Sequence, residues 1–481
     1  MAETEWTWKR IHQPYMKWSA EYVQKLKMQV AKSKWRLGYH IQPETGLLND
    51  PNGFSYFDGK WQLFYQTFPF GAVHGSKAWM HLTSSDLVNW ENHGLAITPD
   101  SKHDAQGAYS GSATVVGNKL FLTYTGNVID ENQNRKSTQL GAWMTADNKV
   151  EKISNPLIAK QPAGYTAHFR DPQILKHGDN YYAIIGAQKT TKAGAILAYK
   201  APEITGPWEY LGELDLGESN LGYMAECPNL LFIEDKPVLL FCPQGLSKEI
   251  MDYESPFVNT YVVGDAFDWE NLKIINPSKI KLLDFGYECY ATQGFNAPDG
   301  RVLTTGWIGL PDATCPNDVD GWSGALTLVR ELRLEDGKLI QRPAKENMLL
   351  QEAKAKRINV GERLKLQSLL KWNFSATNNK TVNIVTDVKN NLSLTVSFDE
   401  KTSKIMVKRE EAGGSAEIRH ARLSDVSNVE VSLWLDNSVF ELYINNGLIA
   451  FAGRIYPEQP YYIVESEDLD LDVSDLKVLW S

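Results

Sequence analysis

Three acidic residues occur in similar settings along this chain of 481 residues. Asp50 and Asp171 each directly precede a proline, and Glu226 lies two residues before one. Each acid is followed by an apolar segment, a tight turn and a second apolar segment. The recurrence predicts that one repeating unit delivers three carboxylates to one place.

Three carboxylates at one mouth, with aromatic residues near them, suit the hydrolysis of a glycosidic bond. A retaining enzyme uses one carboxylate as the nucleophile and a second as acid and then base, about 5 to 5.5 Å apart. Repulsion among the acids raises the pKa of the one that must hold a proton. Taken singly, each acid also has a structural explanation, such as a turn around Asn49 or a surface ion pair of Arg170 with Asp171. Their recurrence in phase with the repeat favours function.

The repeating unit is a strand, a turn and a second strand, followed by further strands. The units begin near Asp50, Ser110, Asp171, Glu226 and Gln293, at steps of 60, 61, 55 and 67 residues. Self-similar units of this kind predict a five-bladed β-propeller, in which the first strand of every blade lines a central channel. We expect the proline after an acid to hold that acid's backbone extended, because a proline is tolerated at the first residue of a strand.

The flanking segments differ from the repeat. Trp18, Tyr22, Leu26 and Val30 are four residues apart and predict an amphipathic helix between Pro14 and Lys34 that packs on the body. After a polar linker at 344–347, alternating segments at 382–386, 392–398, 404–408, 429–435 and 439–444 predict a β-sandwich. The predicted fold is all-β: a helical segment (1–34), a five-bladed β-propeller (35–342) and a C-terminal β-sandwich (348–481).

Composition limits the partners. A formal net charge of −10 argues against nucleic acid and against an anionic membrane surface, and no segment approaches the roughly twenty apolar residues of a membrane helix. The N-terminus has acids where an export signal needs positive charge, and the four cysteines lack zinc spacing, so we expect a reduced cytoplasmic protein. We expect a small sugar as substrate, no metal or other cofactor, and a monomer or homodimer.

An ordered set of motifs resembles the invertase and fructan-hydrolase family, glycoside hydrolase family 32, from about residue 39 to the end of the chain. The motifs are Tyr39-His40, Asn49-Asp50-Pro51-Asn52-Gly53, Phe64-Tyr65-Gln66, Ser110-Gly111-Ser112-Ala113, Phe169-Arg170-Asp171-Pro172, Glu226-Cys227-Pro228 and Gly306-Trp307. The resemblance implies that Asp50 is the nucleophile at the anomeric carbon of a β-fructofuranosyl unit. It implies that Glu226 protonates the leaving oxygen and later activates water, and that Asp171 stabilises the transition state.

The resemblance also implies a set of substrate-binding residues: Leu47, Leu48, Asn49, Gln66, Tyr109, Ser110, Arg170 and Tyr290. Leu47-Leu48 stands where the family carries Trp-Met. Other details, including Ala72-Val73-His74-Gly75 and Ala167-His168, are similar to bacterial sucrose-6-phosphate hydrolases within the family. A phosphate on the leaving glucose would need cations at the rim. The candidates are His74, Lys77, Arg135, Lys136 and Lys189.

The expected activity is therefore that of a retaining β-fructofuranosidase that splits sucrose 6-phosphate into glucose 6-phosphate and fructose. One alternative is an invertase or fructan hydrolase that acts on free sucrose or short fructans. Another is a propeller that binds a sugar or a protein without cleaving it, because fold does not fix function. An arabinan-type propeller hydrolase shares the three-acid plan, but the Asn-Asp-Pro-Asn-Gly and Glu-Cys-Pro strings argue against it.

Overall fold

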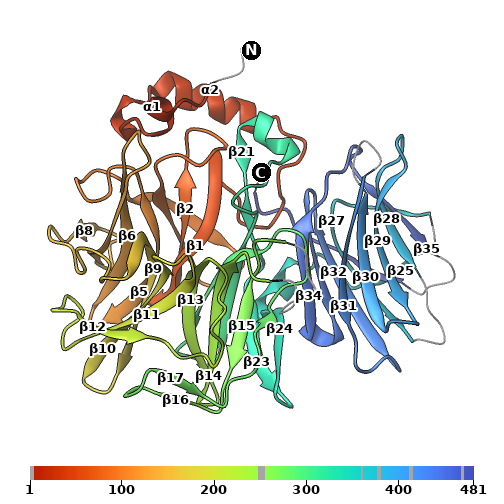
Figure 1. Cartoon of the computed structure of the whole chain (residues 1–481). Helices are drawn as coiled ribbons and strands as arrows, with labels where there is room; N and C mark the ends of the chain where they lie inside the picture. Colours follow the sequence, from red (N-terminus) through yellow and green to blue (C-terminus); the bar gives the residue numbers. More distant parts are fainter. Residues whose placement is uncertain are drawn as a thin grey trace. The chain divides into compact units, whose positions relative to one another are not determined.

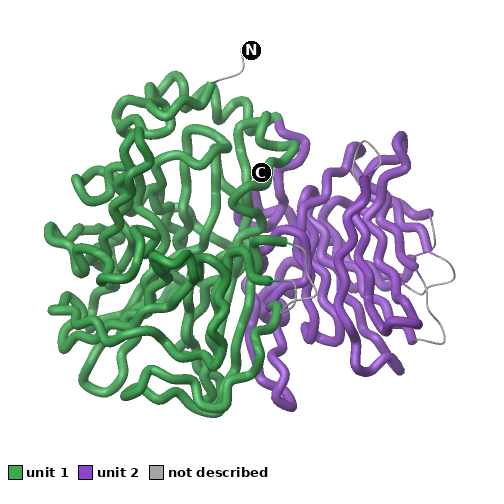
Figure 2. Tube along the Cα trace, in the orientation of Figure 1, with its two compact units in different colours: residues 1–32, 42–282, 290–326 green, residues 33–41, 283–289, 327–481 purple. Residues whose placement is uncertain are grey.

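The computed structural model describes residues 5–247, 255–358, 361–375, 381–410, 415–466 and 471–480. The chain separates into two compact units, coloured separately in Figure 2. Unit 1 contains residues 1–32, 42–282 and 290–326, and unit 2 contains residues 33–41, 283–289 and 327–481.

Unit 1 is a β-propeller of five blades in the residues that the structure describes (Figure 1). The first blade has β1 (Gly46–Phe57), β2 (Lys60–Phe68), β3 (Ala78–Ser84) and β4 (Trp90–Ile97), with β21 (Trp322–Ser323) parallel to β1. The second has β5 (Ala108–Val116), β6 (Lys119–Ile129), β7 (Arg135–Met144) and β8 (Val150–Lys152). The third has β9 (Tyr165–His177), β10 (Asn180–Lys189), β11 (Gly194–Ala201) and β12 (Glu209–Glu213).

The last two blades are less regular. The fourth has β13 (Met224–Ile233), β14 (Lys236–Gln244), β15 (Thr260–Val263) and β18 (Lys281–Leu282), besides a short hairpin of β16 (Ala266–Asp268) and β17 (Lys273–Ile275). In unit 1 the fifth has β19 (Tyr290–Asn296), β20 (Val302–Ile308) and β22 (Ala325–Leu326). The 3-10 helix η2 (Pro316–Asp320) lies between β20 and β22 in the chain. The five strand–turn–strand units of the sequence prediction are the paired strands β1–β2, β5–β6, β9–β10, β13–β14 and β19–β20.

A ring of hydrogen bonds joins the innermost strands of the five blades. In each case a side chain on one inner strand accepts from a backbone N–H of the next inner strand, and the side chains are buried. The pairs are Asn52 with Gly111 (3.0 Å), Ser112 with Ile174 (3.2 Å), Gln173 with Leu230 (2.7 Å), Asn229 with Gly294 (3.4 Å) and Gln293 with Phe54 (3.0 Å). The last pair returns to the first blade, so the ring is closed.

Each inner strand also contains a β-bulge. The register shifts fall at 48–51 in β1, 109–111 in β5, 170–173 in β9, 226–229 in β13 and 290–293 in β19. A bulge places one extra residue in a strand and turns its side chain away from the regular alternation. The bulges thus redirect side chains at one level of the channel.

The backbone of Asp171 differs from the predicted extended conformation. Asp171 has φ +65° and Cys227, which precedes Pro228, has φ +48°. Asp171 is therefore left-handed, not extended, because the bulge geometry overrides the usual effect of a following proline. All three acids lie inside their strands, where the prediction had them at or before the first residue.

The N-terminal part of unit 1 contains α1 (Trp8–Ile11), the 3-10 helix η1 (Tyr15–Lys17) and α2 (Ala20–Val30). The predicted helix is thus confirmed over eleven residues and is shorter than expected. It begins after Ser19, whose hydroxyl accepts from the Tyr22 backbone N–H (3.2 Å) and caps the helix. Trp18 lies outside the helix and stacks on Phe70, with ring centroids 4.5 Å apart.

Unit 2 contains two six-stranded antiparallel sheets that form a β-sandwich. One has β25 (Lys356–Ile358), β36 (Leu471–Asp475), β27 (Gln367–Phe374), β32 (Val429–Asp436), β33 (Val439–Ile444) and β34 (Ile449–Arg454). The other has β26 (Arg363–Leu364), β35 (Tyr462–Ser466), β28 (Val382–Asp387), β29 (Leu392–Asp399), β30 (Lys404–Glu410) and β31 (Ala416–Arg422). The five strands expected here are confirmed by β28, β29, β30, β32 and β33.

Unit 2 also holds the hairpin of β23 (Arg330–Glu335) and β24 (Lys338–Pro343), the 3-10 helix η3 (Lys345–Leu350) and a 3-10 turn, η4 (Asn445–Gly447). The expected polar linker at 344–347 is therefore largely helical. The Asn347 side chain is buried and donates to the backbone carbonyls of Val329 and Ala344, both at 3.0 Å. None of the helices in the described ranges is long and apolar enough to cross a membrane.

Candidate active site

The inner strands of unit 1 bring Asp50, Asp171 and Glu226 to one site. The Cys227 thiol lies 4.0 Å from Asp50 Oδ2 and 3.6 Å from Asp171 Oδ2, and Cys227 directly follows Glu226 on β13. Asp50 and Glu226 are partly exposed, whereas Asp171 is buried. The arrangement places one buried and two accessible carboxylates around a common centre.

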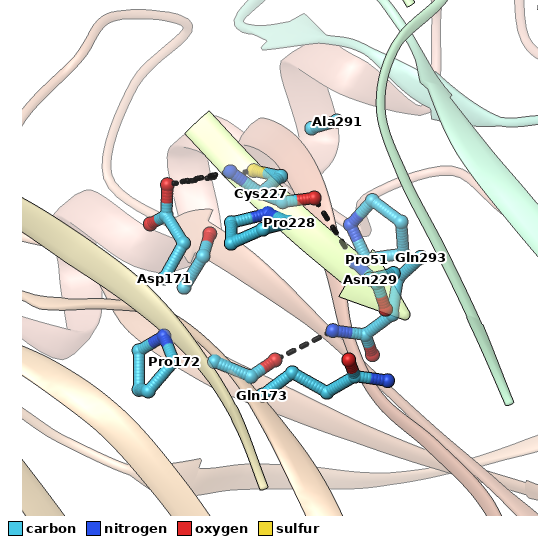
Figure 3. A pocket seen from close by; sticks show the side chains of 11 residues that line it. Pro51, Asp171, Pro172, Gln173, Cys227, Pro228, Asn229, Ala291 and Gln293 are labelled. Atoms are coloured by element: carbon cyan, nitrogen blue, oxygen red, sulfur yellow. Dashed lines mark hydrogen bonds between the residues drawn. The ribbon is translucent and has the colours of Figure 1, made fainter. Parts of the chain in front are cut away.

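A small pocket extends between the inner strands next to Asp171 (Figure 3). The figure shows the Asp171 carboxylate directed at the Cys227 backbone N–H, from which Oδ2 accepts at 3.0 Å. Three prolines, Pro51, Pro172 and Pro228, line the pocket with Gln173 and Gln293. The backbone bond and the bulge at Asp171 fix the direction of this carboxylate.

Asp50 is held by three side-chain donors. Its carboxylate accepts from Ser110 Oγ (2.5 Å), Gln66 Nε2 (3.2 Å) and Asn49 Nδ2 (3.1 Å). Burial raises the pKa of Asp50, hydrogen bonds from Ser110 and Asn49 oppose the rise, and the charge of Glu226 adds to it. The donors therefore favour the ionised form that a nucleophile needs.

Lys77 contacts Asn49, one of the residues that hold Asp50. Its Nζ donates to Asn49 Oδ1 (2.9 Å), and its side chain is only 3% exposed. Burial lowers the pKa of Lys77 to about 7, and the negative charge of Asp50 opposes this change. Lys77 was expected at the rim as a phosphate candidate; the structure places it in the interior beside the Asp50 network.

Glu226 is held by different partners. Arg170 donates to Oε1 from Nε (2.9 Å) and Nη2 (2.6 Å), while Tyr290 Oη (2.6 Å) and Gln244 Nε2 (2.5 Å) donate to Oε2. Gln244 was not predicted as a site residue, although Pro243-Gln244-Gly245 is one of the strings similar to bacterial sucrose-6-phosphate hydrolases. It is brought into the site by the pairing of Met224 with Gln244 and of Glu226 with Cys242.

The three carboxylates also act on one another. Burial raises the pKa of Asp171 to about 7, the positive charge of Arg170 opposes this rise, and the charges of Glu226 and Asp50 add to it. Like charges raise a carboxyl pKa only when they are close. The same three groups therefore share one electrostatic environment.

The expected sugar-binding residues separate into two groups. Asn49, Gln66, Ser110, Arg170 and Tyr290 contact one of the acids directly, and Tyr109 precedes Ser110 on β5. Leu47 and Leu48 are buried, and Leu47 packs in a cluster with Trp18, Phe68 and Phe70. Their side chains belong to the core of unit 1, and the aliphatic pair is explained by this packing.

The remaining rim candidates are dispersed. His74 is exposed, with its ring 6.1 Å from that of Trp307. Lys189 is paired with Glu213 (2.8 Å), and Lys136 is exposed on β7. Arg135 donates to Asn127 Oδ1 (2.5 Å) and lies 5.7 Å from the centroid of the Tyr109 ring. Within the described residues, no group of three or more His, Cys, Asp or Glu side chains is arranged to hold a metal ion.

Comparison with known proteins agrees with this architecture. Residues 40–343 match the N-terminal domain of glycosyl hydrolases family 32, and residues 335–478 match the C-terminal domain of that family. A sucrose-6-phosphate hydrolase of Pediococcus pentosaceus is 44% identical over 94% of this chain and 92% of that protein. One of Streptococcus mutans is 45% identical over 92% of this chain and 93% of its own length.

Solved structures give the same result. The sucrose-6-phosphate hydrolase of Lactobacillus gasseri superposes with a TM-score of 0.92 at 36% identity, over 99% of this chain and all of that one. A β-fructofuranosidase of Bombyx mori superposes with a TM-score of 0.85 at 30% identity, over 95% and 97%. The fold and these likenesses define a glycoside hydrolase built from a five-bladed β-propeller and a β-sandwich. The chain belongs to glycosyl hydrolase family 32.

Proposed function

We propose that this protein is a retaining β-fructofuranosidase that hydrolyses sucrose 6-phosphate to glucose 6-phosphate and fructose. The convergence of Asp50, Asp171 and Glu226 in the propeller carries the proposal for the reaction. Relatives named for sucrose 6-phosphate, at 39 to 45% identity over nearly the whole chain, support the proposal for the substrate.

In the proposed mechanism, Asp50 attacks the anomeric carbon of the fructosyl unit and forms a covalent intermediate. Ser110, Gln66 and Asn49 orient its carboxylate, and hydrogen bonds donated to a carboxylate favour its ionised form. A nucleophile held by its neighbours in one direction loses less freedom on reaching the attacking geometry.

Glu226 protonates the leaving oxygen and then removes a proton from the water that cleaves the intermediate. Arg170, Tyr290 and Gln244 hold both oxygens of this carboxylate. Arg170 and Tyr290 can also donate to sugar hydroxyls. The family resemblance places both at sugar-binding positions.

Asp171 binds fructosyl hydroxyls and stabilises the positive charge that develops on the ring in the transition state. The Cys227 backbone N–H fixes its carboxylate, so the carboxylate does not need to reorient during the reaction. It is the most buried of the three acids, which strengthens its electrostatic effect on a bound cationic sugar.

The alternative substrates are unphosphorylated sucrose and short fructans. These alternatives agree with the Bombyx mori relative, whose name specifies a β-fructofuranosidase and no phosphorylated substrate. The decisive measurement is the ratio of kcat/KM on sucrose 6-phosphate to that on sucrose. We expect a ratio of at least about 100, since one or two charge-assisted hydrogen bonds to a phosphate are worth this much. A ratio near one would favour the unphosphorylated substrates.

We also propose that the protein acts in the cytoplasm as a monomer or homodimer. The four cysteines, all within the described ranges, form no disulfide with one another, which fits a reducing compartment. Fractionation of cells and the molar mass in solution test these two proposals.

A further inference from the structure

His168, which contacts the Glu226 partner Arg170, lies near two basic side chains, Arg135 and Lys192, and the mechanism above uses none of these three residues. Arg135 is the first residue of β7, His168 lies on β9, and Lys192 lies in the turn between β10 and β11. The positive charges of Arg135 and Lys192, with that of Arg170, all act on the His168 ring and help to lower its pKa to about 4, after burial as the main cause.

Hydrogen bonds place the same residues close together. Thr166 Oγ1 accepts from the His168 backbone N–H (3.2 Å) and donates to Gln188 Oε1 (3.3 Å), which also lies 3.4 Å from Lys192 Nζ. Ser137, two residues after Arg135, donates to the backbone carbonyl of Ala167, the residue before His168 (2.7 Å).

The hydrogen bond of His168 fixes the position of its proton. Its Nδ1 lies 3.1 Å from Arg170 Nη1, and a guanidinium group can only donate, so Nδ1 is the acceptor. The neutral ring therefore carries its proton on Nε2. Within the described part of the chain, Nε2 has no hydrogen-bond partner. It remains a donor for a bound ligand.

The charges of Arg135 and Lys192 are not neutralised by acids. Among the described residues, neither has a carboxylate oxygen within 4.0 Å, whereas Arg170 is paired with Glu226 and Lys189 with Glu213. Within the ranges that the structure describes, Arg135 donates only to the neutral Asn127 amide, and the only hydrogen-bond partner of Lys192 Nζ is Gln188 Oε1, at 3.4 Å. In a chain of net charge −10, two nearby cations with no acidic partner among the described residues mark a site for an anion.

The position of this group relative to Glu226 identifies the part of the substrate that it would meet. Arg170 bonds both His168 and Glu226, and the charge of Glu226 also acts on His168. Glu226 is the proposed proton donor to the leaving oxygen, so the basic group lies on the leaving-group side. By contrast, Asp50 and the residues that donate hydrogen bonds to it lie on other strands, β1, β2 and β5.

We propose that Arg135 and Lys192, together with the Nε2–H of His168, form the binding site for the phosphate of the leaving sugar. A phosphate monoester carries nearly two negative charges at neutral pH and offers three acceptor oxygens. A guanidinium fork, an ammonium group and a neutral imidazole N–H supply matching donors. This inference rests on the proposed function and assigns its specificity to three named residues.

The test compares the double variant Arg135→Gln/Lys192→Gln with the wild type on sucrose 6-phosphate and sucrose. We expect kcat/KM on sucrose 6-phosphate to fall by about 100-fold, and each single variant to lose about tenfold. We expect the inhibition constant of glucose 6-phosphate to rise by a similar factor while that of glucose changes little. Lys149→Gln is the matched control for the single variant Lys192→Gln, because it removes one charge from an exposed lysine in the turn after β7.

The outcomes separate the two proposals. If the wild type shows no preference for sucrose 6-phosphate, the proposed substrate is wrong. If the wild type prefers sucrose 6-phosphate and the double variant keeps that preference, the substrate stands and this phosphate site is wrong. An equal loss on both sugars, in a variant whose circular dichroism and melting temperature match the wild type, would also contradict the assignment.

Discussion

At the scale of single residues, the site gives each carboxylate a different environment. Asp50 accepts from neutral side chains, Glu226 is ion-paired with Arg170, and Asp171 is fixed by a backbone N–H. A double-displacement reaction needs two acids that do different work, a nucleophile and an acid/base, and environments of this kind make otherwise similar carboxylates differ.

Lys77 provides a test of the environment of Asp50. Replacing Lys77 by Met removes a buried positive charge that lowers the pKa of Asp50, so the acid limb of the kcat/KM profile should move to higher pH. Lys77→Gln is the matched variant, because it keeps a donor for Asn49 Oδ1 without the charge. The shift should appear in both variants. A shift in the Met variant alone would assign the effect to the hydrogen bond.

The sequence predicted much of the site at this scale, because the three acids recur with their prolines and with the repeat. It predicted neither Gln244 nor the interior position of Lys77. Gln244 reaches Glu226 through the pairing of β13 with β14, and Lys77 reaches Asn49 across the first blade. Such contacts depend on strand register, for which these residues carry no local signal.

At the scale of elements, the inner strands do two jobs. Their bulges turn the acids and their neighbours toward one centre, and side chains just beyond the bulges connect each blade to the next. The hairpins were predictable from the alternation of apolar residues and turn residues. The bulges were not, because an extra residue in one strand shows only against its partner.

Gln293 tests the ring of hydrogen bonds. Its Oε1 accepts from the Phe54 N–H (3.0 Å), and its Nε2 donates to the Gly111 carbonyl (2.6 Å), so it connects the fifth blade to the first two. Gln293→Leu leaves both backbone groups buried without a partner and should lower the free energy of unfolding by about 2 to 4 kcal/mol. Urea unfolding measures this. Gln24→Leu, on the exposed face of α2, is the control and should change stability by less than about 0.5 kcal/mol.

At the scale of the whole molecule, different interactions stabilise the two units. Unit 1 is closed by its ring of inter-blade bonds, whereas unit 2 has one large apolar core between its two sheets and a buried group of charges. The sequence predicted the sandwich from strand alternation. It carried no signal that residues 33–41 join unit 2, because that segment is brought there by polar contacts of His40 and its neighbours with Asp436.

His40 makes the stability of unit 2 depend on pH. Its two ring nitrogens lie 2.9 Å from Asp436 Oδ2 and Glu441 Oε1; burial alone would lower its pKa, but these carboxylates raise the pKa to about 9. The folded pKa exceeds the unfolded value of about 6.5, so the stabilisation, about 3 kcal/mol, is complete below pH 6.5 and is lost as the pH rises through 9. Comparing urea unfolding of the wild type and His40→Gln at pH 6 and 9.5 tests this. A difference between the two proteins that does not shrink at pH 9.5 would contradict it.

The central claim is that Asp50 and Glu226 perform a double displacement on a fructosyl unit. Its most direct test is intact and peptide mass spectrometry of Glu226→Gln after incubation with a β-fructofuranoside that has a good leaving group. Attack by Asp50 needs no acid there, but release needs the missing base, so one fructosyl group should accumulate on the peptide that contains Asp50. The Asp50→Asn/Glu226→Gln variant should remain unlabelled. No adduct on the single variant, or an adduct on another residue, would contradict the account.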